Sequence, residues 1–188
     1  DGGVPVATHA PVLIEEPDKV GASFVGHTLL GHMARVNPHW KAMETSPDTL
    51  VVFSGPHGYV SPGMHGEEPS VPTWNYASVH LTGTVELITD PDGMLAVVER
   101  TVREMESPRS PEWKPSEASR DVFERILKGV VAFRLRVRDE TALFKLSQDQ
   151  QDGVRDRIRD AFAEPSGPDA NPALAGLMTR VDPRESDQ

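Results

Sequence analysis

The chain has 188 residues, no cysteine and a formal net charge of −10. The acidic charge argues against a protein that binds the nucleic-acid backbone, and the lack of cysteine excludes disulfides, thiolate metal sites, iron–sulfur clusters and a thiol nucleophile. No apolar run is long enough to cross a bilayer and no signal peptide is evident, so we expect a cytoplasmic protein with neither a nucleic acid nor a membrane as partner.

The first half of the chain has the pattern of a β protein. Alternating and β-branched residues, bounded by turn-forming residues, predict strands separated by loops. Asn37 as a helix cap, followed by Pro38, predicts a short helix over 37–43. A stretch rich in glycine and proline that starts at Ser61 predicts a loop that leads into a long strand. The predicted strands of this half span 4–14, 24–36, 49–55 and 73–88.

The second half mixes helices with two further strands. Apolar residues alternate with arginines over 130–140, which is typical of a half-buried strand, and a last strand is predicted over 142–147. About six strands with inserted helices favour a mainly β chain with peripheral helices, an α+β chain arranged as an antiparallel barrel. We expect residues 1–164 to form the barrel domain and 165–188 a linker and a short helix packed on it. Helical spacing of apolar residues predicts helices over 90–107, 117–127, 149–164 and 173–181.

His65 has the most distinctive surroundings of the seven histidines, because Gly63 and Gly66 flank it in the predicted loop. A neutral imidazole on such a loop could reach a flat macrocycle and bind its iron. We then expect the side chain to contribute little to packing, so that its truncation costs little stability. The alternative is a solvent-exposed loop histidine. Glu67 and Glu68 are either surface charges or groups that orient an imidazole or bind a cationic amine.

Two aromatic residues and a second histidine leave a similar choice open. Trp74 and Tyr76 either pack in the barrel or stack on a planar cofactor. His57 follows a Gly-Pro pair and fits either a surface position or a functional one. No two histidines have the spacing of a zinc protease motif, so the sequence does not predict a zinc site of that kind.

Five stretches carry motifs in a fixed order along the chain: ATHAPVL (7–13), GHMARVNPHW (31–40), VFSGPHGYVSP (52–62), VPTWNYASVHLTG (71–83) and FKLSQDQ (144–150). Together they resemble the signature of the PaiB family, which is described as FMN-binding negative transcriptional regulators. The resemblance extends from residue 4 to about residue 180. It implies the FMN-binding split β-barrel, formed as a homodimer with the cofactor site between the subunits.

The sequence departs from that family after the third motif. Where the family reads S-P-x-W-Y, this chain reads SPGMH, so that Met64 and His65 replace the aromatic pair. This replacement resembles the haem-dependent piperazate synthase branch of the family, which binds haem b in place of FMN. The resemblance implies a lyase of nonribosomal peptide biosynthesis. Such an enzyme forms the N–N bond of L-piperazic acid from N5-hydroxy-L-ornithine with loss of water.

The resemblance to this branch implies a role for each candidate residue. His65 is expected to be the axial ligand of the haem iron, and Arg35 to pair with the α-carboxylate of the substrate. A catalytic acid and base are expected from four residues, among which the sequence does not choose: Glu67, Glu68, His57 and Lys41. The expected cofactor site also includes Met64, His32, Trp74, Asn75 and Tyr76. The alternative is a flavin- or haem-binding regulator or sensor without catalysis, with FMN as the alternative cofactor.

Overall fold

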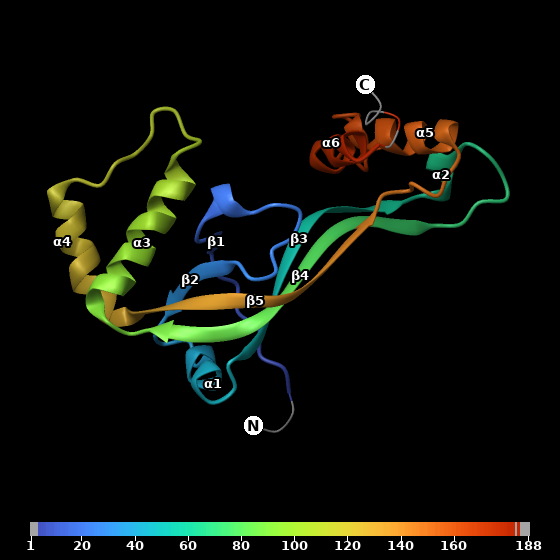
Figure 1. The fold of residues 1–188 in the computed structure, drawn as a ribbon. Coiled ribbons are helices and arrows are strands. Elements are labelled where there is room, and N and C mark those ends of the chain that lie inside the picture. Colours follow the sequence, from blue (N-terminus) through green and yellow to red (C-terminus); the bar gives the residue numbers. More distant parts are fainter. Residues whose placement is uncertain (1–3, 183, 185–188) are drawn as a thin grey trace. The chain divides into compact units, whose positions relative to one another are not determined.

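The computed structural model of the protein describes residues 4–182 and 184 and contains both strands and helices (Figure 1). The strands are β1 (Val12–Ile14), β2 (Thr28–Ala34), β3 (Asp48–Val60), β4 (Thr73–Ile88) and β5 (Val130–Lys145). The helices are α1 (His39–Thr45), α2 (Pro62–His65), α3 (Pro91–Glu106), α4 (Glu117–Ile126), α5 (Asp152–Ala163) and α6 (Pro172–Arg180), with short 3₁₀ turns η1 (Pro17–Lys19) and η2 (Leu127–Gly129). No helix within these residues is long and apolar enough to cross a membrane.

The strands of the described residues form one five-stranded sheet in the order β1-β2-β5-β4-β3. β2 pairs antiparallel with both β1 and β5, and Gly31 lies opposite Val12 on one side and Phe133 on the other. A sheet of this kind with helices outside it confirms the predicted fold class, mainly β with peripheral helices. The long strand over 73–88 and the four longer helices lie within a few residues of their predicted positions.

Only the strand predicted over 73–88 has the expected bounds, and the other predicted strands differ from the observed ones. The strand expected over 4–14 is limited to β1, and the two strands expected over 130–140 and 142–147 are one continuous strand, β5. The strand expected over 49–55 continues through the Gly-Pro pair that follows it, so that β3 ends at Val60. The glycines there serve close approach, because a Cβ at Gly55 would lie 3.1 Å from the Cβ of Ala77. Small residues let a strand run close beside a neighbour where a turn would otherwise be expected.

The chain divides into two compact units, and the boundaries between them fall inside β3, β4 and β5. The first unit contains the residues up to Val51 and Leu81–Glu140. Its β5 residues alternate as predicted, with apolar side chains buried and the arginines exposed. α3 packs against β2 and closes the apolar cluster of this unit. The buried members of that cluster are Leu30, Ile88, Met94, Val97, Leu127 and Ala132.

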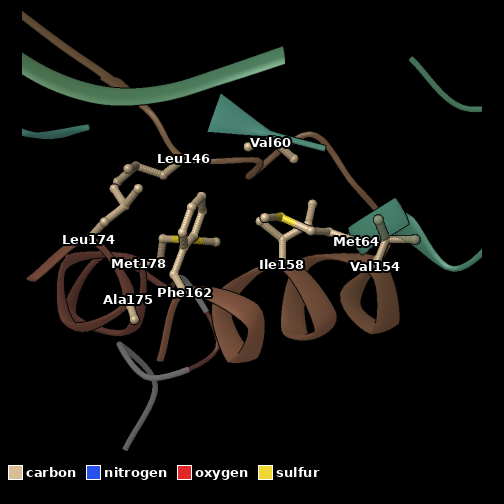
Figure 2. Close-up of a cluster of buried hydrophobic side chains, with 9 residues drawn as sticks. All are labelled: Val60, Met64, Leu146, Val154, Ile158, Phe162, Leu174, Ala175 and Met178. Atoms are coloured by element: carbon tan, nitrogen blue, oxygen red, sulfur yellow. The ribbon is translucent and has the colours of Figure 1, made fainter. Parts of the chain in front are cut away.

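The second unit contains Val52–His80 and the residues from Thr141 onward. α5 packs against both α2 and α6, and the three helices enclose one apolar cluster with the ends of β3 and β5 (Figure 2). The cluster consists of Val60, Met64, Leu146, Val154, Ile158, Phe162, Leu174, Ala175 and Met178. His65 directly follows a member of this cluster, so the packing of α5 fixes the place of the candidate ligand.

Candidate functional site

The residues around His65 form a capped helical turn where the sequence predicted a loop. The Ser61 hydroxyl accepts a hydrogen bond from the Gly63 amide at 3.3 Å, and Pro62 occupies the first helical position. α2 ends at Gly66, which has a left-handed backbone with φ of +69°. A serine cap, a proline at the first position and a glycine just past the end are the residues that such a turn favours.

His65 is buried, with 8% of its surface exposed, so the expectation that it contributes little to packing is wrong. Met64 beside it is equally buried and points into the cluster of Figure 2. The two ring nitrogens of His65 differ in their surroundings. Nδ1 is hydrogen-bonded to the Ser70 hydroxyl. Nε2 is buried and has no hydrogen-bond partner among the residues that the structure describes. Buried polar atoms without a hydrogen-bond partner are few in native proteins, so each of them needs an explanation.

Arg157 of α5 holds the backbone of His65 in place. Its Nε donates to the His65 carbonyl oxygen over 2.7 Å, and its Nη2 donates to the same oxygen. The space for this guanidinium exists because Gly66 has no side chain, since a Cβ there would lie 2.8 Å from Nε of Arg157. The glycine beside His65 therefore serves a helix end and an arginine contact. From the sequence, we expected this glycine to leave the loop flexible, so that His65 could reach a cofactor.

The two glutamates after His65 have different surroundings. The Glu68 carboxylate accepts a hydrogen bond from the Ser70 amide at 3.1 Å, which fixes the backbone of the residue that contacts the imidazole. Glu67 is exposed and lies 4.0 Å from Nη2 of Arg157, so it forms a loose surface ion pair. Glu68 thus acts on the local backbone, and Glu67 keeps its carboxylate open to solvent.

Trp74 and Tyr76 line a pocket of about 540 Å³ on the second unit. The ring of His57 stacks on Trp74, with 5.7 Å between centroids and 25° between planes. The pocket can therefore offer flat aromatic surfaces to a planar ligand. His65 is not among its lining residues, which are Ser54, Gly55, His57, Trp74, Tyr76, Ala77, Ser78, His80, Thr141 and Leu143.

Asn75 points to the other face of β4, because neighbouring residues of a strand alternate. It is fully buried, accepts a hydrogen bond from the Ser147 hydroxyl at 3.1 Å and lies 3.8 Å from the sulfur of Met178. The residues predicted around one cofactor are thus divided within the second unit. Asn75 and Met64 lie on the helix-covered side, and Trp74 lies in the pocket.

Three predicted residues belong to the first unit. Burial lowers the pKa of His32, whose Nδ1 has no hydrogen-bond partner in the part of the chain that the structure describes. Arg35 donates to the Val130 carbonyl at 3.2 Å, and its guanidinium lies 5.3 Å from the ring of Trp40. The ammonium of Lys41 lies 5.6 Å from the same ring. Two cations therefore lie beside one indole, an arrangement that a cation–π attraction stabilises.

A site made of several protein ligands is not present within residues 4–182 and 184, because no three His, Cys, Asp or Glu side chains lie close enough to hold a metal ion. A metal held here through His65 would need its other ligands from elsewhere.

Sequence reasoning missed Ser70 and Arg157. Ser70 lies only five residues after His65 and could have been proposed from the sequence. A histidine that binds a metal commonly donates its other ring N–H to an oxygen, and the Ser70 hydroxyl is a nearby candidate. Arg157 is 92 residues away from His65. Its contact depends on how α5 packs on α2, and no local pattern signals it.

Residues 1–139 match the family described as "Putative FMN-binding domain". The chain belongs to this family. It is also 31% identical over 176 residues to "Protease synthase and sporulation protein PAI 2" of Bacillus subtilis, an alignment that covers 94% of this chain and 81% of that protein. These findings confirm the resemblance to the PaiB family that the motifs indicated.

The chain is also similar, more distantly, to other proteins. The chain is 27% identical over 202 residues to "Uncharacterized protein AN0679" of Emericella nidulans, covering 92% of this chain and 80% of that protein. Among solved structures, it is similar to the flavocytochrome Anf3 from Azotobacter vinelandii with a TM-score of 0.42 and 16% identity. That match covers 62% of this chain and only 50% of the other, and a score so low supports no argument about function.

Proposed function

We propose that this chain is a haem-dependent piperazate synthase, with His65 as the axial ligand of haem b. The observation that carries the proposal is the state of the His65 ring. Its Nε2 is buried without a partner among the described residues, while Nδ1 is held by the Ser70 hydroxyl. A metal-binding histidine has this division of roles, with one nitrogen on the metal and the other hydrogen-bonded to an orienting oxygen.

The residues around His65 fit a haem in two further respects. Met64, the residue directly before His65, is buried in an apolar cluster with residues of α5, and a hydrophobic setting is one of the features that tune a haem iron. Among the described residues no three His, Cys, Asp or Glu side chains lie close enough to hold a metal ion, so iron bound through His65 would take its other ligands from the cofactor. Because Nε2 is covered in this structure, binding requires that haem displace the contacts that bury it.

The proposed reaction closes a six-membered ring and is balanced without an external electron donor. The lone pair of the substrate's α-amine forms a bond to N5, and the N5–O bond breaks with its electron pair leaving on oxygen. The α-amine gives up one proton and the departing hydroxyl gains one, so the second product is water. Haem iron, when bound, supplies a Lewis-acidic centre that polarises the N–O bond of a hydroxylamine.

The side chains of this chain would then manage protons. Glu67 and Glu68 lie in the same segment as His65, and Glu67 has the more open carboxylate, so we propose it as the acceptor of the α-amine proton. His57, which belongs to the same unit as His65, remains a proposed proton-transfer group. Arg35 and Lys41 belong to the first unit, where both contact the Trp40 ring, and they have no role in this proposal.

We also propose that the active protein is a homodimer. Apolar side chains are exposed along the strands of the second unit, and large exposed apolar groups of this kind commonly mark an interface. They are Val52, Phe53, Tyr59, Trp74, Leu143 and Phe144. Sedimentation at micromolar concentration is expected to give the mass of two chains, and a monodisperse monomer would contradict the proposal.

A second candidate function is a flavin- or haem-binding regulator or sensor without catalysis. The pocket favours it, because the stacked rings of His57 and Trp74 suit the flat ring system of a flavin. The description of the family points in the same direction. A net charge of −10 argues against binding to the DNA backbone, so we propose that a regulator of this kind would act through a protein or a small molecule.

The two functions are separated by titrating the purified protein with haem and, separately, with FMN. We expect haem to give a Soret band that saturates at one haem per chain. The loaded protein should convert N5-hydroxy-L-ornithine to piperazate, detected by mass spectrometry. Uptake of FMN in place of haem would support the second candidate, and uptake of haem without turnover would support a sensor.

A further inference from the structure

We infer that Ser70 is a positioning residue that selects the tautomer of His65, with the proton on Nδ1 and the lone pair on Nε2. This inference rests on the proposed function of His65. The hydroxyl of Ser70 can donate to Nδ1 or accept from it, so the contact between them permits either tautomer of the neutral ring. The surroundings of the other nitrogen decide between the two.

The surroundings of Nε2 favour a lone pair there. If Ser70 donated to Nδ1, the ring proton would lie on Nε2, where the described residues offer no acceptor. A buried N–H without an acceptor costs free energy, and orphaned donors are rarer in proteins than under-satisfied acceptors. If Nδ1–H donates to Ser70, the proton has a partner and Nε2 presents a lone pair. That lone pair is the group that binds a metal ion.

The local structure holds both partners of this hydrogen bond. The Ser70 amide is fixed on the Glu68 carboxylate, and the His65 carbonyl is fixed on the Arg157 guanidinium. The imidazole is thus positioned through its ring by Ser70 and through its backbone by α5. Two anchors of this kind set the direction in which Nε2 points before any ligand arrives, which lowers the entropy cost of binding.

The consequence for haem follows from the same contact. Removing the oxygen that orients a metal-binding histidine typically weakens metal affinity about 10–100-fold. A hydroxyl is also a weaker acceptor than a carboxylate, so it gives the imidazole less anionic character. Ser70→Asp should therefore lower the reduction potential of bound haem relative to the wild type.

The tautomer can be read without haem, by ¹⁵N NMR of the histidine rings in the haem-free protein. We expect a protonated Nδ1 for His65 in the wild type and in Ser70→Thr, which keeps the hydroxyl. Ser70→Ala should shift the ring toward the Nε2–H form. Ser61→Ala is the matched control, because Ser61 caps the same helix without contacting the imidazole.

The outcomes separate this inference from the proposed function. A wild-type His65 with its proton on Nε2 overturns the inference, and so does a folded Ser70→Ala variant that keeps the wild-type tautomer. The wild-type spectrum alone shows which ring nitrogen of His65 carries the proton, so the inference can be overturned even if Ser70→Ala does not fold. A protein with the expected tautomer that takes up no haem overturns the proposed function and leaves the tautomer assignment standing.

Discussion

Arg157 and His65 lie 92 residues apart in the sequence, and Nε of Arg157 donates to the carbonyl oxygen of His65 over 2.7 Å. The contact closes the end of α2, where a carbonyl without a helical partner attracts a cation. It also ties the proposed iron ligand to α5, whose other face is buried in the apolar cluster of the second unit.

Replacing Arg157 should therefore affect haem retention more than the fold. A hydrogen bond from a charged donor contributes roughly 1.5–3 kcal/mol to the free energy of unfolding. The Arg157 guanidinium is half exposed to solvent, so we expect its contribution to be about 1–2 kcal/mol. We expect Arg157→Ala to speed haem loss to apomyoglobin about tenfold, and Arg157→Lys to be intermediate because it lacks the planar donor pair. Arg159→Ala is the control, since Arg159 bonds acidic residues of its own helix. Equal haem loss in both alanine variants would contradict the anchoring role.

Gly66 and Gly63 should respond in opposite ways to alanine. Gly66 has φ of +69°, and an added Cβ would lie 2.8 Å from Nε of Arg157, so Gly66→Ala should cost at least about 1–2 kcal/mol of the free energy of unfolding. Gly63 is within α2 and its added Cβ would meet only the Ser61 hydroxyl, at 3.6 Å. Gly63→Ala should leave stability unchanged or raise it by up to about 1 kcal/mol. Urea unfolding measures both, and a neutral Gly66→Ala would show that the left-handed cap does not matter.

The sequence predicted the type of nearly every element but not how the elements bring side chains together. β4 was predicted residue for residue because its alternating and β-branched pattern is long and bounded by turns. The segment around His65 was predicted as a loop because glycine and proline usually interrupt structure. In the structure Pro62 is the first residue of a helical turn that Ser61 caps, and Gly66 ends that turn.

The division of the predicted cofactor residues could be foreseen only in part. Strand alternation alone separates Asn75 from Trp74, which was available from the sequence. The burial of His65 was not, since it depends on the packing of α5 against α2. That helix follows in the chain about 90 residues later, and no local pattern shows where it packs.

The pocket of the second unit gives a separate prediction for FMN. If a flavin binds there, Trp74→Ala should weaken FMN affinity by roughly 5–30-fold, because an aromatic stacking contact contributes about 1–2 kcal/mol with its buried area. Trp113→Ala is the matched control, because Trp113 is as exposed as Trp74 and does not line the pocket. The measurement is quenching of FMN fluorescence. Identical affinities for the two variants would place any flavin site elsewhere.

His32 predicts a pH dependence of stability in the first unit. Burial lowers its pKa from the usual 6.5, so the unfolded chain binds a proton at a higher pH than the folded chain does. The free energy of unfolding should therefore fall as pH drops below about 6.5 toward the lower folded-state pKa, and the contribution is complete above that range. His32→Gln should remove this part of the pH profile in urea unfolding measured from pH 5 to 8. Parallel profiles for the variant and the wild type would show that His32 is not the residue responsible.

The central claim is that His65 binds the iron of a haem, and the absorbance of reconstituted protein tests it most directly. Wild type, His57→Ala and His65→Ala are titrated with haem, with circular dichroism to confirm the fold, because truncating a buried and hydrogen-bonded histidine costs about 1–3 kcal/mol. We expect one haem per chain in wild type and in His57→Ala. His65→Ala should lose most of the Soret band and all piperazate formation, and added imidazole should restore part of the band. A folded His65→Ala variant with a full Soret band and normal turnover would contradict the account.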